Sequence, residues 1–113
     1  MELRYYQDAS GRSPFIAWLS ELRDKGARSR IQARLAVLAT GLFGDTRAVG
    51  EGVLELRISW GPGYRVYFAR LGEVVVLLLC GGDKRTQDED ITNAKRLFKD
   101  FKRRTRQAPR RSS

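Results

Sequence analysis

The feature that most constrains the fold is a segment of the sequence that predicts a β-hairpin, residues 53–71. Apolar and polar residues alternate on both sides of a Gly-Pro-Gly turn at positions 61–63, which is the period of two expected for half-buried strands. Centring the hairpin on Gly61 brings apolar residues together on one face, with Leu54 opposite Phe68, Leu56 opposite Val66 and Ile58 opposite Tyr64. A slip of one residue would turn this face to solvent, so the alternation predicts a single register.

The other face of the predicted hairpin brings two arginines together. In the same register Glu55 lies opposite Tyr67, and Arg57 lies opposite Arg65. Two cations directly opposite one another on a sheet repel. An anion between them would relieve the repulsion, since guanidinium groups match the oxygens of a phosphate. The alternative interpretation is that Glu55 neutralises the pair as part of an ordinary salt-bridged face.

Before this hairpin the sequence predicts one strand and two helices. Residues 3–6 are short and aromatic, as expected of a strand. A Ser-Pro signal begins an amphipathic helix over residues 14–25, which Gly26 ends, and a second helix follows over residues 27–42. The very short connection predicts an antiparallel helical hairpin. The glycine-rich stretch over residues 41–52 is predicted to be a loop or a weak edge segment.

After the hairpin the sequence predicts a central strand and a last helix. Residues 74–80 are apolar on both faces, which is typical of a strand in the middle of a sheet. Thr86 and Glu89 have the spacing of a capping box that begins a helix ending near Phe101. Residues 102–113 contain six basic residues and no acidic one, and we expect them to form a disordered tail.

These elements define the predicted fold class and domain organisation. The order β-α-α-β-β-β-α predicts an α+β domain over residues 1–101, in which a small, mostly antiparallel sheet is packed by an N-terminal helical hairpin and a C-terminal helix. The basic tail over residues 102–113 follows it. A chain of 113 residues has the length of one domain.

Composition excludes several classes of chemistry. The chain contains no histidine, which excludes Ser-His-Asp and Cys-His catalysis and histidine metal sites. Its one cysteine, Cys80, allows neither an internal disulfide nor a cysteine-rich zinc site. We therefore expect no metal and no cofactor. The absence of a signal region or a long apolar run predicts a cytoplasmic protein that does not enter a membrane.

The charge of the chain is unevenly distributed. Lys and Arg number 22 against 13 Asp and Glu, which gives a net charge of +9 and is typical of a chain that meets a polyanion. Most of this excess belongs to residues 102–113, because residues 1–101 hold 16 basic and 13 acidic residues. The more specific signal is positional: Lys84 follows the strand over residues 74–80, and this places Arg57, Arg65 and Lys84 on one face of rigid elements, where a phosphate site is best built.

Two motifs resemble those of a known toxin family. They are Gly-Pro-Gly-Tyr-Arg-Val-Tyr-Phe at positions 61–68, and Cys-Gly-Gly-Asp-Lys at positions 80–84 with Gln87, Asp90 and Ile91 after it. With the Leu-Glu-Leu-Arg sequence at positions 54–57, they resemble the HigB-like addiction module killer branch of the RelE/ParE toxin superfamily. The resemblance extends from Tyr5 to about Phe101 and implies a RelE-like fold.

The resemblance implies the toxin of a type II toxin–antitoxin module. HigB-like and RelE-like members are ribosome-dependent endoribonucleases that cut mRNA by attack of the ribose 2′-hydroxyl on the adjacent phosphate, without a metal. By position, Arg65 would clamp the scissile phosphate, Lys84 would protonate the leaving 5′-oxygen or bind phosphate, and Arg57 would be the cation on the preceding strand. We expect further substrate-binding residues at Trp60, Tyr64, Tyr67 and Arg85.

The same resemblance implies partners and leaves alternatives open. The expected partners are a cognate helix-turn-helix antitoxin, the mRNA and the ribosome, with operator DNA contacted only through the antitoxin complex. Several nucleases of the family use a late Tyr or His, and this chain has neither after Tyr67. The general base is therefore unassigned among Glu55, Asp83 and Tyr67. A ParE-like poison of DNA gyrase and a non-catalytic nucleic-acid-binding module are the alternative functions.

Overall fold

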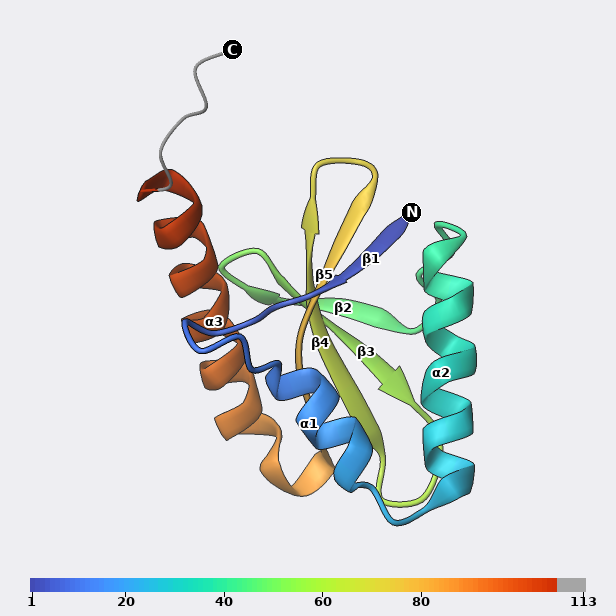
Figure 1. The fold of residues 1–113 in the computed structure, drawn as a ribbon. Helices are drawn as coiled ribbons and strands as arrows, with labels where there is room; N and C mark the ends of the chain where they lie inside the picture. Colours follow the sequence, from blue (N-terminus) through green and yellow to red (C-terminus); the bar gives the residue numbers. More distant parts are fainter. Residues whose placement is uncertain (108–113) are drawn as a thin grey trace.

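A five-stranded sheet with helices on both faces forms the protein, and the computed structural model describes residues 1–107 of it (Figure 1). In chain order the elements are β1 (Glu2–Tyr5), α1 (Pro14–Glu21), α2 (Lys25–Ala39), β2 (Thr46–Gly50), β3 (Val53–Ile58), β4 (Tyr64–Leu71), β5 (Val75–Asp83), a 3-10 turn (Lys84–Thr86) and α3 (Gln87–Gln107). The strand order is β1-β5-β4-β3-β2; β1 runs parallel to β5, and the other neighbours are antiparallel. The predicted α+β class and mostly antiparallel sheet are confirmed.

The central hairpin has the register that its alternation predicts. β3 and β4 pair Leu54 with Phe68, Leu56 with Val66 and Ile58 with Tyr64. The turn between them uses positive φ angles of 53° at Gly61 and 83° at Gly63, which glycine adopts at little cost. The hairpin therefore places Arg57 directly opposite Arg65, as predicted.

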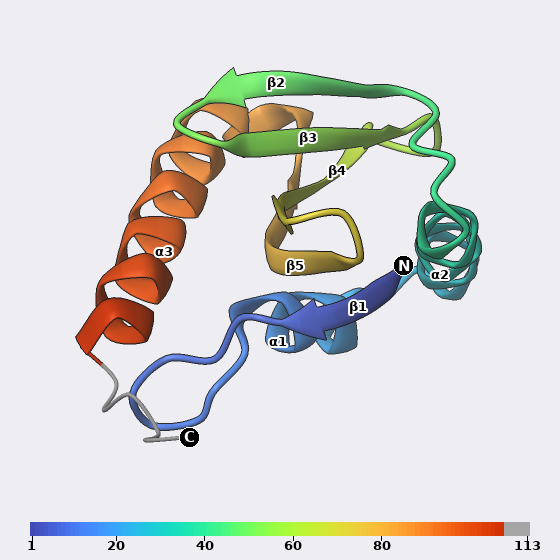
Figure 2. The same cartoon turned by 90° about the horizontal axis from the view of Figure 1, so that it is seen from above.

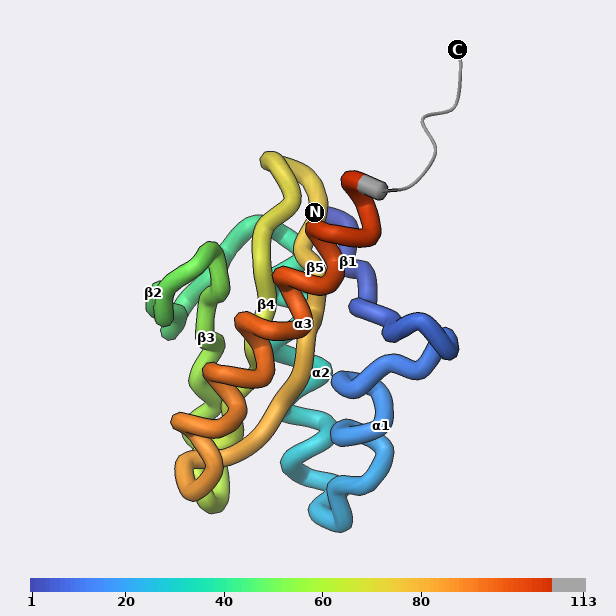
Figure 3. The backbone as a smooth tube through the Cα atoms, turned by 90° about the vertical axis from the view of Figure 1, so that its left-hand side faces the viewer, coloured from blue at the N-terminus to red at the C-terminus, as the bar shows by residue number. Residues whose placement is uncertain are grey.

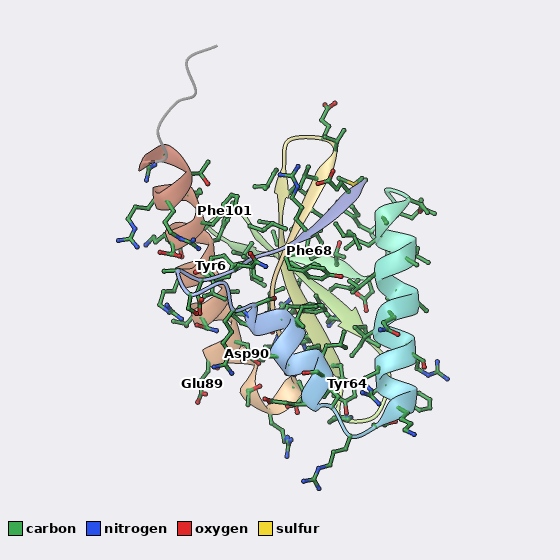
Figure 4. The ribbon with its side chains drawn as sticks, in the orientation of Figure 1. Tyr6, Tyr64, Phe68, Glu89, Asp90 and Phe101 are labelled. Carbon is green, nitrogen blue, oxygen red and sulfur yellow. The ribbon has the colours of Figure 1, made fainter. Side chains whose placement is uncertain are left out.

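Both faces of the sheet are covered (Figure 2). On one face, α1 and α2 bury the even-numbered side chains of β3 and β4, and Figure 4 shows Phe68 near the centre of the sheet. On the other face α3 packs Ala94, Leu97 and Phe98 against the odd-numbered side chains and against β5. The part of the hairpin face near α3 is consequently interior: Glu55 has no exposed surface and Arg65 is nearly buried, whereas Arg57 on the same face is exposed.

The boundary between the first two helices differs from the prediction. α1 ends at Glu21, and the carboxylate of Asp24 caps α2 by accepting a hydrogen bond of 3.1 Å from the Ala27 N–H. Gly26 therefore lies inside the first turn of α2 and does not end a helix. A Cβ there would be 3.1 Å from the Trp60 ring, so the glycine allows that ring to approach. The two helices diverge from their three-residue connection in a V and do not form a tight hairpin (Figure 1).

The glycine-rich stretch before the hairpin contains a strand. β2 pairs antiparallel with β3 at the edge of the sheet, and its register shifts between Ala48 and Gly50. β2 is short and largely exposed, so its sequence lacks the clear alternation of apolar and polar residues that predicts a strand. At the edge of the sheet it pairs with a neighbour on one side only. Of the two predictions for this stretch, loop or weak edge segment, the second is correct.

The last helix is longer than predicted. α3 continues to Gln107, so the boundary at Phe101 and the expected disorder of residues 102–107 are wrong. The reason is a tertiary contact: the Tyr6 hydroxyl donates to Asp100 at 2.5 Å, Arg104 donates to Asp100 at 2.9 Å, and Arg104 also donates to the Gln7 carbonyl. These bonds tie the end of α3 to the segment after β1. The rest of the expected tail, residues 108–113, lies outside the described residues.

The start of α3 is also built differently from a capping box. The chain first forms the 3-10 turn Lys84–Thr86, in which the Asp83 carboxylate accepts from the Arg85 N–H at 2.8 Å. The Thr86 hydroxyl donates to the Asp90 carboxylate at 2.5 Å. Three acidic residues in the first turn of α3 complement the positive end of its dipole.

We expect acid to loosen the end of α3 through Asp100. The hydrogen bond from Tyr6, with those from Arg103 and Arg104, lowers the pKa of Asp100 to about 2, against about 3.9 in an unfolded chain. The stabilisation is therefore fully present above about pH 4 and is lost as the pH falls through about 2. NMR shifts of residues 100–107 should lose helical character over this range. An Asp100→Asn variant should show the loosening already at pH 5. A variant that remains fully helical over residues 100–107 at this pH would show that the hydrogen bonds of Asp100 do not hold the end of α3.

Candidate functional site

Three predicted site residues lie at one end of the sheet. Arg57 is on β3, Arg65 is opposite it on β4, and Lys84 follows the end of β5. Lys84 and Arg65 both lie close to the turn residue Gly63, because a Cβ placed there would be 3.6 Å from the Lys84 Cβ and 3.7 Å from Arg65 Nη1. The structure thus brings these three cations onto the same end of neighbouring strands, as the sequence predicts.

Arg65 is held in one orientation. It is only 8% exposed, its Nη1 donates to the Gly63 carbonyl at 3.2 Å, and its Nε lies 3.5 Å from Glu55 Oε2. Nε makes no hydrogen bond within the described part of the chain, so its interaction with Glu55 is that of an ion pair at longer range. One edge of the guanidinium thus faces a buried carboxylate, and Nη1 faces the turn.

Glu55 is the centre of a buried hydrogen-bond network. Its Oε2 accepts from the Tyr67 hydroxyl at 2.9 Å and from Gln87 Nε2 at 3.0 Å, and its Oε1 accepts from Arg47 Nε at 2.9 Å. Burial by itself would raise the pKa of Glu55, but the hydrogen bonds from Arg47, Tyr67 and Gln87 outweigh it and hold the pKa below its usual value. Glu55 is therefore ionised, and it joins β2, β3, β4 and α3.

The two facing arginines each have their own carboxylate. Arg65 pairs with Glu55, whereas Arg57 donates from Nε and Nη2 to Asp45 at 3.3 and 3.2 Å. The Arg57–Asp45 pair is about half exposed, so solvent screens it and its contribution to stability is small. The interpretation that Glu55 neutralises the pair is thus correct for Arg65 only, and Arg57 can turn toward a ligand at little cost.

Lys84 and Arg85 are exposed on the 3-10 turn. Arg85 pairs with Asp83 at 3.1 Å, and the side-chain hydrogen bond from Arg85 lowers the pKa of Asp83 below its usual value. The two residues border a shallow pocket that continues to Glu89, and Figure 4 shows Glu89 pointing outward from the start of α3. The Lys84 Cβ and Arg65 Nη1 both lie close to Gly63, so Lys84 is a solvent-facing cation beside Arg65.

The aromatic residues expected to bind substrate lie elsewhere. Tyr64 is on the face covered by α1, with its ring edge against Trp18. Trp60 packs on the same side, where its Nε1 donates to Asp24 and the Arg30 guanidinium lies 3.8 Å from its ring centre. Tyr67 faces α3 but has no exposed surface. None of these three rings lines the end of the sheet where the cations lie, so direct contact with a substrate there requires rearrangement.

None of the candidate general bases is free to take a proton. Both oxygens of Glu55 already accept hydrogen bonds, and Asp83 is paired with Arg85. Burial, with the hydrogen bond to Glu55, raises the pKa of Tyr67 well above its usual value. Asp90 was not predicted, and it differs from these groups because burial raises its pKa. Its carboxylate accepts a hydrogen bond from the Thr86 hydroxyl and lies against Gly82.

Packing on both sides explains the Gly81-Gly82 pair at the end of β5. A Cβ at Gly81 would collide with the ring of Trp18 from α1, and a Cβ at Gly82 would collide with the Asp90 carboxylate from α3. Gly82 is also the strand partner of Arg65. The glycines thus let α1 and the start of α3 approach opposite sides of the strand beside the candidate site.

The described residues offer no ready site for a metal. No group of three or more Cys, Asp or Glu side chains within residues 1–107 is arranged to hold an ion. Burial raises the pKa of Cys80 to about 12, so this thiol behaves as the small apolar residue that the sequence predicts. Within the same residues, no helix is long and apolar enough to cross a bilayer.

Three residues of the site were missed by the sequence analysis. Arg47 and Asp45 lie in the stretch predicted to be a loop or a weak edge segment, and Gln87 is the first residue of α3. The signal that could have identified them is Glu55 itself: a carboxylate on a strand with both faces covered needs donors from neighbouring elements.

The comparison with curated proteins gives a relative in Haemophilus influenzae. The chain is 50% identical to an uncharacterized protein of that organism over 87 residues, which cover 77% of this chain and 88% of the relative. No family model matches the chain.

Removing Glu55 should destabilise the protein strongly. A Glu55→Ala variant leaves the buried Tyr67 hydroxyl and the half-buried Gln87 amide without their acceptor and the nearly buried Arg65 without its counter-ion, and should cost about 3–5 kcal/mol in urea unfolding. Tyr67→Phe removes one bond to a charged group and should cost about 1.5–3 kcal/mol. Arg57→Ala is the control, because its pair with Asp45 is about half exposed and should contribute less than about 1 kcal/mol. Equal effects of Glu55→Ala and Arg57→Ala would show that the network does not stabilise the fold.

Proposed function

The chain belongs to the same protein family as this Haemophilus influenzae protein, and we propose that it is the toxin of a type II toxin–antitoxin module. In this proposal it is a HigB-like member of the RelE/ParE superfamily, an endoribonuclease that cuts mRNA on the ribosome and inhibits translation. Support for a RelE-like fold comes from the motifs at positions 61–68 and 80–84, and from a mostly antiparallel sheet with α1 and α2 on one face and α3 on the other.

The observation that carries the proposal is the arrangement of three cations around the turn after β3. Arg65 is nearly buried and oriented by Glu55, while Arg57 and Lys84 are exposed on the elements beside it. A fixed guanidinium flanked by two adjustable cations suits a phosphodiester whose charge increases during a reaction. A purely structural ion-pair network has no need of the exposed Lys84.

The proposed reaction cleaves one phosphodiester bond. The ribose 2′-oxygen attacks the adjacent phosphorus while the bond from phosphorus to the 5′-oxygen of the next nucleotide breaks, which leaves a 2′,3′-cyclic phosphate and a 5′-hydroxyl. Negative charge accumulates on the phosphoryl oxygens during the attack. We assign Arg65 to these oxygens, because a cation that is already oriented stabilises the transition state without reorganisation. Arg57 would leave Asp45 to contact the same phosphate.

Two protons move in this reaction. Lys84 is assigned as the donor to the leaving 5′-oxygen, because this lysine is exposed and its Cβ lies close to Gly63, as does Arg65 Nη1. The proton of the 2′-hydroxyl needs an acceptor, and the proposal assigns none of Glu55, Tyr67 and Asp83, since each is already engaged. Arg85 would contact the RNA backbone beside Lys84.

The proposal includes a partner that blocks the toxin. A cognate helix-turn-helix antitoxin would cover the cationic end of the sheet, and operator DNA would be contacted only by the complex. The protein would act in the cytoplasm, on mRNA and the ribosome. A reading frame for such an antitoxin next to the gene for this chain would support the module.

Replacing Arg65 should abolish toxicity while the protein still folds. Glu55 keeps three hydrogen-bond donors in Arg65→Ala, so the circular dichroism spectrum should be retained. Cleavage of mRNA by translating ribosomes, mapped by primer extension, should fall by about 10²–10³-fold, as expected for loss of one oriented donor. Arg65→Lys keeps the charge without the guanidinium fork and should also be impaired.

The matched control is Arg70→Ala. Arg70 lies on the same strand, but its guanidinium stacks on Phe43 on the face away from Arg65, so this variant should remain toxic. Growth arrest with DNA breaks that depend on gyrase, and without mRNA cuts, would contradict the proposal and indicate a ParE-like poison of DNA gyrase. Binding of nucleic acid with no damage to it would indicate a non-catalytic nucleic-acid-binding module.

A further inference from the structure

The charge of α3 is strongly divided along its length. The first turn carries Asp88, Glu89 and Asp90, whereas residues 95–107 hold seven basic residues and one acidic residue, Asp100. Because α3 is helical to Gln107, these cations have fixed positions on a rigid element and are not spread along a disordered tail. The charge excess of residues 102–107 is therefore a property of the folded domain.

Four of these cations form a stripe on the outer side of the helix. Steps of three, four and three residues place them on one face, and they line a shallow groove together with Asp100. This α3 basic face consists of Arg96, Lys99, Arg103 and Arg106. All four are exposed, and Figure 3 views the molecule from the side that α3 covers. With a rise of about 1.5 Å per residue the stripe is about 15 Å long.

Few acidic side chains compensate the α3 basic face. Asp100 accepts from Arg103 and Arg104 and from the Tyr6 hydroxyl, so its charge is already shared among three donors. Glu51 lies 3.5 Å from Lys99 but also pairs with Lys95. The face therefore keeps an excess of positive charge on a rigid support, and an anion with several charges along a line would match it.

We propose that the α3 basic face binds the phosphate backbone of the single-stranded RNA that the protein cuts. The choice of RNA rests on the proposed function. The face is on the same side of the sheet as Arg65, and α3 begins at the candidate site, where Gln87 donates to Glu55. Regularly spaced cations on a helix hold a strand through its phosphates, without reading its sequence.

The composition of the face favours a nucleic acid over a protein or a membrane. Protein interfaces depend on buried apolar and aromatic anchors, and the large exposed apolar side chains of residues 1–107 are Tyr5, Ile16, Val37, Leu42 and Val74, none of them on α3. A helix that binds a bilayer needs a free apolar face. The apolar face of α3 is already packed on the sheet through Ala94, Leu97 and Phe98.

The test measures binding separately from cleavage. Fluorescence anisotropy would follow a labelled, unstructured 2′-O-methyl RNA of about 15 nucleotides, which has no free 2′-hydroxyl and cannot be cut. At about 3.4 Å per phosphate this strand is about three times as long as the stripe. The variant Arg96→Gln/Lys99→Gln/Arg106→Gln keeps Arg103 and the Asp100 anchor. The control variant Arg23→Gln/Lys25→Gln/Arg28→Gln removes three cations at the start of α2 and just before it, on the other face of the sheet from α3.

The expected difference lies in both affinity and salt dependence. Loss of three phosphate contacts should lower the slope of log affinity against log salt by about two, and should weaken binding about a hundredfold at 0.1 M salt. The control variant should lose less than about threefold, since it changes only the distant charge. An equal loss in both variants would overturn the proposal, because net charge alone would then explain binding. Tighter binding of DNA of the same sequence would also overturn it.

Ribosome assays on the same proteins separate this inference from the proposed function. If the wild-type protein cuts mRNA and the α3 variant binds the RNA as tightly as wild type, RNA binding by the α3 basic face is contradicted and the proposed nuclease activity is supported. If the wild-type protein cuts no mRNA but the α3 variant loses RNA binding, binding by the α3 basic face is supported and the proposed nuclease activity is contradicted. Loss of pelleting with vacant ribosomes, with unchanged binding of the RNA strand, would assign the face to ribosomal RNA and overturn the proposal.

Discussion

A buried carboxylate, Glu55, connects the elements on which the candidate site is built. It accepts hydrogen bonds from β2, β4 and α3 while it sits on β3, and it pairs with Arg65. An ionised group without exposed surface is costly unless its oxygens are satisfied, so the three hydrogen-bond donors and Arg65 have to converge on it for the fold to be stable. This requirement fixes the start of α3 against the hairpin, and it fixes the direction in which Arg65 points.

Much of the sheet follows from local pattern. The alternation across Gly61 determines the register of β3 and β4, and the run over residues 74–80, apolar on both faces, predicts a central strand that the structure extends to Asp83. The same register already placed Tyr64 on the face opposite Arg65, so its position near α1 could have been predicted from parity alone. The same parity places Trp60 on this face with Ile58, and Gly26 lets the start of α2 approach its ring there.

The end of α3 depends partly on contact between distant parts of the chain. Asp100 pairs locally with Arg103 and Arg104, which favours a helix here, and the bond from Tyr6 to Asp100, across 94 positions, ties this helix end to the segment after β1. β2 is likewise visible only once β3 offers it a partner. At the site, the sequence predicted the three cations but missed two of the donors that hold Glu55, the partner of Arg65. Arg47 and Gln87 contact Glu55 only in the folded sheet.

Orientation and attraction are supplied by different residues in this arrangement. Glu55 orders Arg65 but also cancels much of its charge at a distance, because the two groups form a nearly buried pair. Arg65 is therefore a poor attractor of a distant anion and a good contact for one already in place. In the proposed function, attraction has to come from cations that are less compensated, and these are Lys84 at the turn and the α3 basic face. In the proposed function, a rigid phosphate contact next to a buried carboxylate thus depends on exposed positive charge nearby, and the long, basic end of α3 would supply it.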